Sequence, residues 1–173
     1  MSAGHEGQRL VVGISGASGA IYGVRLLQLL CGTPIETHLI MSQAARVTLA
    51  HETDLKVAEV EALATVVHPN TDIGAACASG SFRTLGMVVA PCSVKTMSEI
   101  ATGTTANLLS RAADVALKER RRLVLLLRET PLHLGHIRSM AAVTEAGAIV
   151  YPPVPAFYAR PAAPKPMADH TLG

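Results

Sequence analysis

A strand, a glycine turn and the start of a helix follow one another near the beginning of the chain, and this unit most limits its possible folds. Residues 10–14 form a short apolar, partly β-branched run, which is typical of a buried strand. Glycines follow at even spacing at Gly13, Gly16 and Gly19, and residues 20–30 carry apolar side chains at helical spacing. Free amides and the dipole at such a helix start favour an anion, and glycine lets a phosphate approach the backbone. We therefore expect a phosphate-binding βα unit here.

The spacing of these glycines also excludes two nucleotide sites. The order is G-x-x-G-x-x-G, whereas the dinucleotide fingerprint is G-x-G-x-x-G with an acidic residue after the second strand. The second predicted strand, 35–41, ends in Ser42 and Gln43 without a carboxylate, and the chain has no P-loop motif. A mononucleotide phosphate fits better than NAD or ATP. A tight turn without a ligand is the alternative, but Ser15 and Ser18 beside three glycines exceed what a turn needs.

Strands and helices alternate along the rest of the chain. The patterns predict helices at 20–30, 43–50, 55–64, 94–101, 107–122 and 136–146, and strands at 35–41, 66–68, 86–90, 123–127 and 148–151. Such alternation predicts an α/β domain with a doubly wound parallel sheet. The segment 75–82 reads as a loop of small residues that packs against either a ligand or a subunit.

Length and composition limit the size of this domain and the kinds of partner that it binds. The 173 residues fit one domain, predicted at 10–161, with a flexible N-terminus at 1–9 and a Pro/Ala-rich tail at 162–173. Apolar residues make up 49% and charged residues 16%, so we expect much uncharged surface buried against copies of the chain. The net charge of +2 is too small to indicate nucleic-acid binding.

The same sequence predicts a cytoplasmic protein. Three cysteines without C-x-x-C spacing argue against disulfides and a zinc site. Cys92 is expected to be a small buried residue. His133 and His136 lack a third nearby ligand, so they are interpreted as residues of a helix start. No apolar run approaches the length of a membrane span, and the polar N-terminus does not resemble a signal peptide.

Polar side chains follow most of the predicted strands. In doubly wound sheets, ligands bind beyond the carboxyl ends of the strands. The segments expected to meet there contain hydroxyls, an arginine, a glutamate and a tyrosine. These segments are 15–18, Ser42, 91–96, Arg128 with Glu129, and 152–158. This set predicts an anion-binding pocket with acid–base capacity.

Five runs of the sequence resemble one family. They are GISGASGAIYG from Gly13, APCSVKT from Ala90, RAADVALKER from Arg111, RETPLHLGH from Arg128 and PPVPAFY from Pro152. Together they are similar to the UbiX family of flavin prenyltransferases, which includes the small partner proteins of phenolic acid decarboxylases. The resemblance covers roughly residues 10–161, with its motifs in order.

The resemblance implies a fold, a reaction and partners. The expected fold is Rossmann-like (flavodoxin-like) with three α/β/α layers, assembled into a homo-oligomer, a dodecamer, with FMN at subunit interfaces. The implied reaction joins a dimethylallyl group from dimethylallyl phosphate to N5 and C6 of reduced FMN. The product, prenylated FMN, passes to a UbiD-type decarboxylase. No metal takes part in the transfer.

The resemblance also assigns site residues. The implied cofactor-binding residues are Gly16, Ala17, Ser18, Ser42, Ser93, Val94, Lys95, Thr96 and Arg128. Ser15, Glu52 and Glu129 match catalytic residues near the flavin and the prenyl group. The prenyl phosphate is assigned to Arg111, Lys118 and Tyr158, partly across a subunit boundary. A further arginine is implied in a final helix beyond Gly173, and without it we expect FMN binding to persist and prenyl transfer to weaken.

Cleavage of the prenyl donor requires positive charge near its phosphate. Breaking an allylic C–O bond leaves negative charge on the phosphate, so fixed cations and a phenol stabilise the transition state more than the ground state. Arg111 and Lys118 are seven residues apart, hence on one helix face, although an ordinary solvated face has the same spacing. Glu129 is a candidate proton carrier, and Glu52 assists by electrostatics or proton transfer.

Two other functions remain as alternatives. One is an FMN-binding carrier without transfer activity. The other is a flavin-dependent cysteine decarboxylase of the related fold, although the run PCSVKT at 91–96 differs from that group's P-A-S-A-N-T motif.

Overall fold

The computed structural model describes residues 8–155 and 164–172. Its strands are β1 (Arg9–Ile14), β2 (Glu36–Met41), β3 (Val66–Pro69), β4 (Gly86–Cys92), β5 (Arg122–Leu127) and β6 (Ile149–Val150). Its helices are α1 (Ala20–Leu30), α2 (Gln43–Glu52), α3 (Val57–Glu61), α4 (Val94–Thr102), α5 (Leu108–Lys118), α6 (Leu134–Glu145) and α7 (Pro164–Leu172), with a 3₁₀ turn, η1, at Ala76–Ala78.

The six strands form one sheet in the order β3-β2-β1-β4-β5-β6. Every neighbouring pair is parallel, so all carboxyl ends lie at the same edge. This is the Rossmann strand order, and its direction reverses between β1 and β4. The predicted α/β doubly wound sheet is confirmed.

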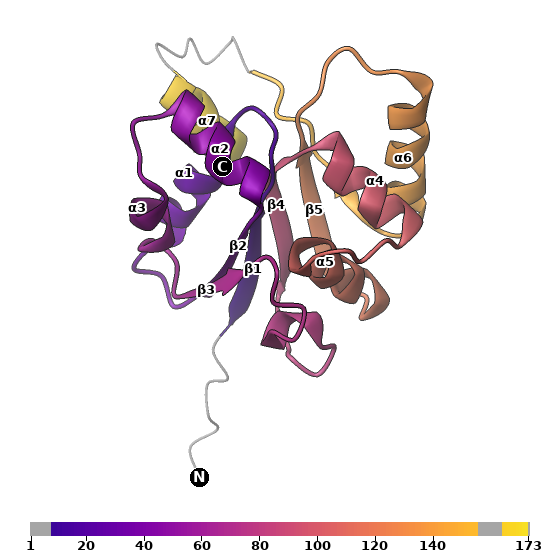
Figure 1. The fold of residues 1–173 in the computed structure, drawn as a ribbon, viewed down its shortest axis with the longest axis horizontal. Helices are drawn as coiled ribbons and strands as arrows, with labels where there is room; N and C mark the ends of the chain where they lie inside the picture. The colour runs from indigo at the N-terminus through magenta and orange to yellow at the C-terminus, as the bar shows by residue number, and fades with distance from the viewer. Residues whose placement is uncertain (1–7, 156–163, 173) are drawn as a thin grey trace.

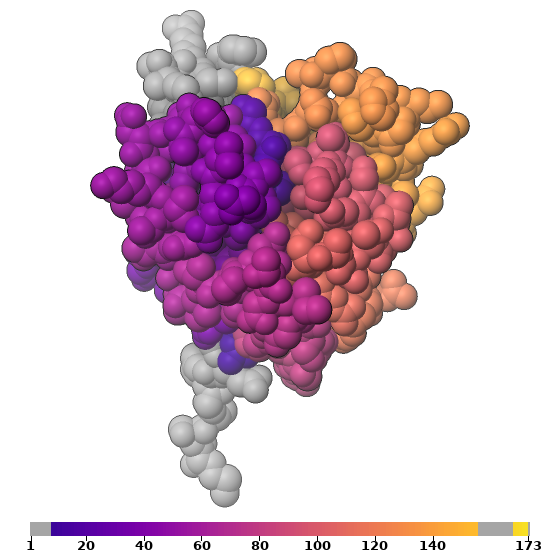
Figure 2. Space-filling view, viewed as in Figure 1, coloured from indigo at the N-terminus to yellow at the C-terminus, as the bar shows by residue number. Residues whose placement is uncertain are grey.

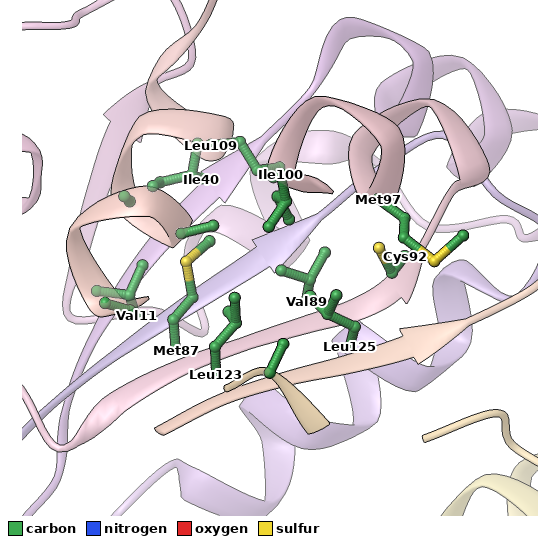
Figure 3. Packing of buried hydrophobic residues seen from close by; sticks show 14 of the residues in the cluster. Val11, Ile40, Met87, Val89, Cys92, Met97, Ile100, Leu109, Leu123 and Leu125 are labelled. Carbon is green, nitrogen blue, oxygen red and sulfur yellow. The ribbon is translucent and has the colours of Figure 1, made fainter. Parts of the chain in front are cut away.

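Helices cover both faces of the sheet. In Figure 1, α1, α2, α3 and α7 lie on one side of the strands, and α4, α5 and α6 lie on the other. One core packs side chains of α4 and α5 against β4 and β5; Figure 3 shows Val89, Leu125, Met97 and Cys92 within it. A second core packs Val24 and Leu27 of α1 against β1 and β2. The expected three-layer α/β/α arrangement is therefore present.

Helix α7 covers part of the sheet that the other helices leave open. A third cluster contains Tyr22 of α1, Ala90 of β4, Leu126 of β5 and Ala168 of α7. The guanidinium of Arg25 pairs with the carboxylate of Asp169, which links α1 to α7. From the sequence we expected only a Pro/Ala-rich tail here, because residues 164–172 lack a strong amphipathic pattern of their own.

Helix α5 is shorter than predicted. The expected helix runs through residue 122, but α5 ends at Lys118, and Arg120 adopts a left-handed φ of 57°. The chain must turn at this point because Arg122 already pairs with Gly86 in the sheet. The guanidinium of Arg121 stabilises the turn by donating to the carbonyls of Gly80 and Phe82, at 2.6 and 2.7 Å.

Candidate functional site

A cavity of about 940 Å³ opens at the carboxyl edge of the sheet, near the ends of β1 and β4, where the strand order reverses. In the space-filling view, the N-terminal half of the chain and the C-terminal half meet along a seam (Figure 2). Polar side chains and glycine-turn backbone line part of the cavity wall: Gly16, Ala17, Ser18, Ser42, Gln43, Asn70, Ser93, Lys95, Thr96, Asn107, Arg128, Glu129 and Thr130. The remaining wall is apolar: Ala44, Val94, Leu109, Leu127, Pro152, Pro153, Val154 and Pro155.

The structure therefore brings together all the residues assigned to cofactor binding. They come from four segments, which are the turn after β1, the start of α2, the start of α4 and the end of β5. Glu129, assigned to catalysis, lies in the same wall. The roles of these residues stay predictions, whereas their convergence is a property of the fold.

The N-terminus of α1 already binds an anion, and this anion is Glu52. The Glu52 carboxylate accepts hydrogen bonds from the amides of Gly19, at 2.9 Å, and Ala20, at 3.1 Å. From the sequence we expected an external phosphate at this helix start. Instead, an internal carboxylate from the end of α2 takes these two amides, so Glu52 does not line the cavity.

The environment of Glu52 favours its ionised form. Partial burial by itself raises the pKa, but hydrogen bonds from Ser18, Gly19 and Ala20 outweigh this effect, and the nearby Arg128 guanidinium acts in the same direction as these bonds. The pKa of Glu52 is therefore held below its ordinary value. At neutral pH this carboxylate is negative and is poorly suited to donating a proton.

The N-terminus of α4 offers free amides to the cavity. The hydroxyl of Ser93 caps the helix by accepting from the amide of Thr96 at 3.2 Å, as predicted. In the described part of the chain, the amides of Val94 and Lys95 have no acceptor. An anion bound here would meet two backbone donors and the positive end of the helix dipole.

Ser15 lies beneath this site rather than in it. Its side chain is buried, and its hydroxyl donates to the carbonyl of Pro91 at 2.9 Å and accepts from the amide of Ser93 at 2.8 Å. With these bonds the hydroxyl joins the ends of β1 and β4. Although Ser15 was assigned to catalysis, it does not line the cavity, and its contacts suit a residue that positions Ser93.

The turn after β1 packs closely against α2. A Cβ at Gly16 would lie 2.3 Å from the Cβ of Ala44, so only glycine fits there. Ser42 caps α2 by accepting from the amide of Ala45 at 3.0 Å, which confirms the predicted cap. Gly19 adopts a φ of 100°, a conformation that glycine favours.

Arg128 and Glu129 follow β5 directly. The amide of Arg128 donates to the carbonyl of Cys92 at 3.0 Å, which continues the pairing of β4 with β5 beyond the strands. Its guanidinium reaches the carbonyl of Ser18, at 3.4 Å, across the mouth of the cavity. The carboxylate of Glu129 accepts from the neighbouring amide of Thr130, at 3.0 Å. Both side chains are exposed enough to meet a ligand.

Two asparagines in the wall were not predicted from the sequence. The side chain of Asn107 caps α5 by accepting from the amide of Ser110 at 3.0 Å. The backbone carbonyl of Asn70 accepts a hydrogen bond from the amide of Leu108, and its side-chain Oδ1 accepts one from the amide of Leu109, each at 2.9 Å. Asn107 was identifiable as a cap residue at a helix start. Nothing in the sequence pattern indicates that Asn70 accepts hydrogen bonds from the start of α5, because the two segments are distant in the sequence and meet only in the folded chain.

Arg111 and Lys118 do not line the cavity. Arg111 donates to the carbonyl of Ala78 at 3.2 Å and to the carboxylate of Asp114 at 2.8 Å. Lys118 is partly exposed and pairs with Glu119. Both lie on the side of α5 that faces the segment around η1. Tyr158, the third residue assigned to the prenyl phosphate, lies outside the described residues.

A histidine pair joins the neighbouring strands β2 and β3. Nδ1 of His38 lies 2.9 Å from Nε2 of His68, and Nε2 of His38 lies 2.8 Å from the Glu36 carboxylate. The two rings are stacked, and Phe82 contacts His38 edge-on. Burial lowers the pKa of His68, and the neighbouring His38 lowers it further, while Asp72 acts in the opposite direction.

The remaining candidate groups are structural. Cys92 is fully buried, which raises the pKa of its thiol to about 12 and makes it a poor nucleophile. His133 caps α6 and stacks on His136, as expected for residues of a helix start. Within residues 8–155 and 164–172, no cluster of three or more metal-ligand side chains occurs. Nor does any helix in the described ranges have the length and apolarity to cross a membrane.

Comparison with known proteins identifies the family. Residues 2–162 match the model of the Flavoprotein family. The flavin prenyltransferase UbiX of Escherichia coli K12 is 62% identical over 166 residues, which cover 95% of this chain and 88% of that protein. The UbiX of Thauera aromatica is 60% identical over 153 residues, or 88% of this chain and 79% of that protein. The chain belongs to the UbiX family of flavin prenyltransferases.

Solved structures of UbiX proteins agree with this assignment. AnUbiX (PadA1), in complex with FMN and dimethylallyl pyrophosphate, has a TM-score of 0.94 at 49% identity, covering 96% of this chain and 88% of that chain. A dodecameric FMN-dependent UbiX-like decarboxylase from Escherichia coli O157:H7 has a TM-score of 0.93 at 46% identity, covering 95% of this chain and 91% of that one. The cysteine decarboxylase TvaF, at 15% identity and a TM-score of 0.67, shares the fold alone.

Proposed function

We propose that this chain is a flavin prenyltransferase that joins the dimethylallyl group of dimethylallyl phosphate to N5 and C6 of reduced FMN. The prenylated FMN so formed is handed to a UbiD-type decarboxylase. The observation that carries this proposal is the cavity in which the four predicted cofactor segments meet, in a chain 62% identical to a UbiX flavin prenyltransferase.

The cavity suits FMN in size and chemistry. Its volume of about 940 Å³ lies within the range of cofactor sites. FMN has a phosphate at one end and a flat, largely apolar ring system at the other, and the wall has hydroxyls and free amides as well as an apolar stretch. We assign the phosphate to the start of α4, where the amides of Val94 and Lys95 are free and Ser93 and Thr96 supply hydroxyls.

Reduced FMN supplies the nucleophilic N5 and C6 atoms, and the protein must stabilise the departing phosphate. When the allylic C–O bond breaks, the phosphate leaves with the bonding electrons and needs compensating positive charge. Arg111, Lys118 and Tyr158 are the groups proposed for this task. Because Arg111 and Lys118 lie outside the cavity of their own protomer, we propose that they serve the cavity of a neighbouring copy.

Assembly of several copies is supported by the apolar surface at the start of α6. Leu132, Leu134 and Ile137 are 40%, 58% and 51% exposed, and Val154 in the cavity wall is 76% exposed. Apolar side chains grouped in this way favour burial in an interface. We propose a homo-oligomer, as in the dodecameric relative, with cavities completed across subunit boundaries.

The two glutamates have different proposed roles. Glu129 lies in the cavity wall with a carboxylate that binds the next amide, so it can carry a proton between the flavin and the phosphate. Glu52 is ionised and fixed to the start of α1. We therefore assign Glu52 to electrostatic balance of Arg128 rather than to proton transfer.

The test is to incubate the protein anaerobically with reduced FMN and either dimethylallyl phosphate or its diphosphate. Mass spectrometry and absorbance of the released flavin then report the outcome. A flavin heavier by one prenyl unit supports the proposal, and comparing the two donors identifies the preferred phosphate. A bound but unchanged flavin favours a carrier. In a separate reaction with oxidised FMN and a peptide that ends in cysteine, loss of carbon dioxide with reduction of the flavin favours the decarboxylase reaction.

A further inference from the structure

Glu99 connects two side chains of the cavity wall without lining the cavity itself. Its carboxylate lies 2.5 Å from Nζ of Lys95 and 3.3 Å from Nδ2 of Asn107. The Glu99 side chain is only 15% exposed, whereas that of Lys95 is 77% exposed. A carboxylate that is so little exposed to solvent is costly to bury unless it is paired or hydrogen-bonded, and Lys95 and Asn107 supply these contacts. Lys95 is therefore restrained by an anchored acid.

The restraint turns the Lys95 ammonium away from the start of α4. Lys95 follows Val94 in the first turn of the helix, and Glu99 lies four residues further along. Four residues correspond to about 6 Å of helix, so the pair draws the ammonium toward the C-terminal end and away from the free amides. A lysine in the first turn would otherwise be well placed to contact a phosphate at those amides.

We propose that Glu99 is a positioning residue that keeps Lys95 from contacting the phosphate of the bound flavin, and so limits the affinity for FMN. The inference rests on the proposed function, in which the phosphate lies at the start of α4. A flavin that must leave for a second enzyme cannot be held too tightly. Pairing Lys95 with an internal carboxylate leaves the phosphate to the amides and hydroxyls of residues 93–96.

The contact with Asn107 allows the charge to be separated from the packing. Asn107 donates through Nδ2 to Glu99 while its Oδ1 caps α5. In Glu99→Gln, an amide oxygen still accepts from Asn107, so the link from α4 to α5 is preserved. Only the charge that holds Lys95 is lost.

The experiment measures the dissociation constant and release rate of FMN by flavin fluorescence at low and high salt. We expect Glu99→Gln to bind FMN about twofold to threefold more tightly, as the strength of an exposed i,i+4 ion pair allows, with slower release and a steeper loss of affinity in salt. Adding Lys95→Met to Glu99→Gln should abolish the gain, because Lys95 is its source. Glu145→Gln, an exposed change on α6, is the control and should match the wild type.

Equal or weaker FMN binding by Glu99→Gln overturns the inference, as does a gain that survives Lys95→Met. Melting curves establish that the variants are folded. If Glu99→Gln does not fold, Glu99→Asp should show a smaller gain of the same sign, because its shorter side chain loosens the contact with Lys95 but keeps the charge. A wild-type protein that fails to bind FMN overturns the proposed function and this inference together, whereas normal wild-type binding with no gain in the variant overturns the inference alone.

Discussion

The hydroxyl of Ser15 accepts a hydrogen bond at 2.8 Å from the backbone amide of Ser93, which lies 78 positions further along the chain. It also donates to the carbonyl of Pro91 at 2.9 Å. These bonds cross the point where the strand order reverses, between β1 and β4. The cap of α4, and with it the free amides of the cavity, is thus fixed by a residue of the first βα turn.

Ser15→Ala should therefore weaken both the fold and the cofactor site. The change leaves the Ser93 amide without its buried acceptor, at a cost of about 1–3 kcal/mol, whereas the Pro91 carbonyl still accepts from the backbone amide of residue 15. We expect a lower urea midpoint and weaker FMN binding. Ser98→Ala is a suitable control, since among the described residues the Ser98 hydroxyl contacts only the hydroxyl of Ser139, at a long 3.5 Å. Unchanged FMN affinity in Ser15→Ala would contradict the positioning role.

Glu52 should stabilise the fold in a pH-dependent way. Its pKa is lowered in the folded protein from 4.5, so its contribution is present above that value and is lost as the pH falls through the lower folded pKa. We expect Glu52→Gln to cost about 0.5–1 kcal/mol at neutral pH, the usual range for a helix N-terminal anion. The unfolding free energies of the two proteins, measured in urea, should converge in acid once the pH lies below the folded pKa of Glu52. An equal difference at both pH values would exclude this origin.

Glu129→Gln separates binding from chemistry. The substitution keeps the size of the side chain but removes the proton-carrying group, so FMN should bind as before. Formation of prenylated flavin should fall by roughly 10²–10⁴-fold, the usual contribution of acid–base catalysis. Flavin fluorescence measures the first quantity and anaerobic turnover the second. Unchanged turnover would remove Glu129 from the mechanism.

His68 should make the protein less stable on mild acidification. Burial and His38 lower its folded pKa below 6.5, so the unfolded chain takes up the proton more readily. Stability should decline as the pH falls through about 6.5 and level off below the folded pKa. The effect on the free energy of unfolding should be small, because His68 is partly solvated and water screens its charge. In His68→Gln the melting temperature should change less between neutral and mildly acidic pH than in the wild type.

Gly16→Ala should disturb the cavity from the side of α2. The added methyl group would lie 2.3 Å from Cβ of Ala44, and overpacking of this kind costs about 1–3 kcal/mol. The turn and α2 must separate, which moves Ser18 and Ser42 apart. We expect weaker FMN binding and a lower melting temperature. Restoring space with Ala44→Gly in the same protein should recover part of both losses.

The parts of this protein that depend on local pattern could be predicted from its sequence. The strand at 10–14 and the helix at 20–30 were predicted by apolar spacing, and Ser42 and Ser93 by the preference of helix starts for a hydroxyl. The cofactor segments could be grouped because parallel strands end at a common edge. These predictions do not depend on knowing the tertiary contacts between helices.

The missed features depend on contacts between distant residues. Glu52 fills the start of α1 from 33 positions away, a partner that no motif indicates. Asn70 reaches the amides of α5 through a turn of irregular backbone. The end of α5 was predicted too late because the basic residues at 120–122 are favourable near a helix C-terminus. Pairing of Arg122 with Gly86 in the sheet requires an earlier turn.

The contact of α7 with α1 affects the order in which the protein can be completed during synthesis. The apolar cluster of Tyr22 and Leu126 is complete only when Ala168 of α7 packs against it. A nascent chain that already contains all six strands but not α7 therefore still exposes this apolar surface to chaperones near the ribosome. Folding of this domain is therefore expected to finish after translation has passed α7, rather than strand by strand as the chain emerges.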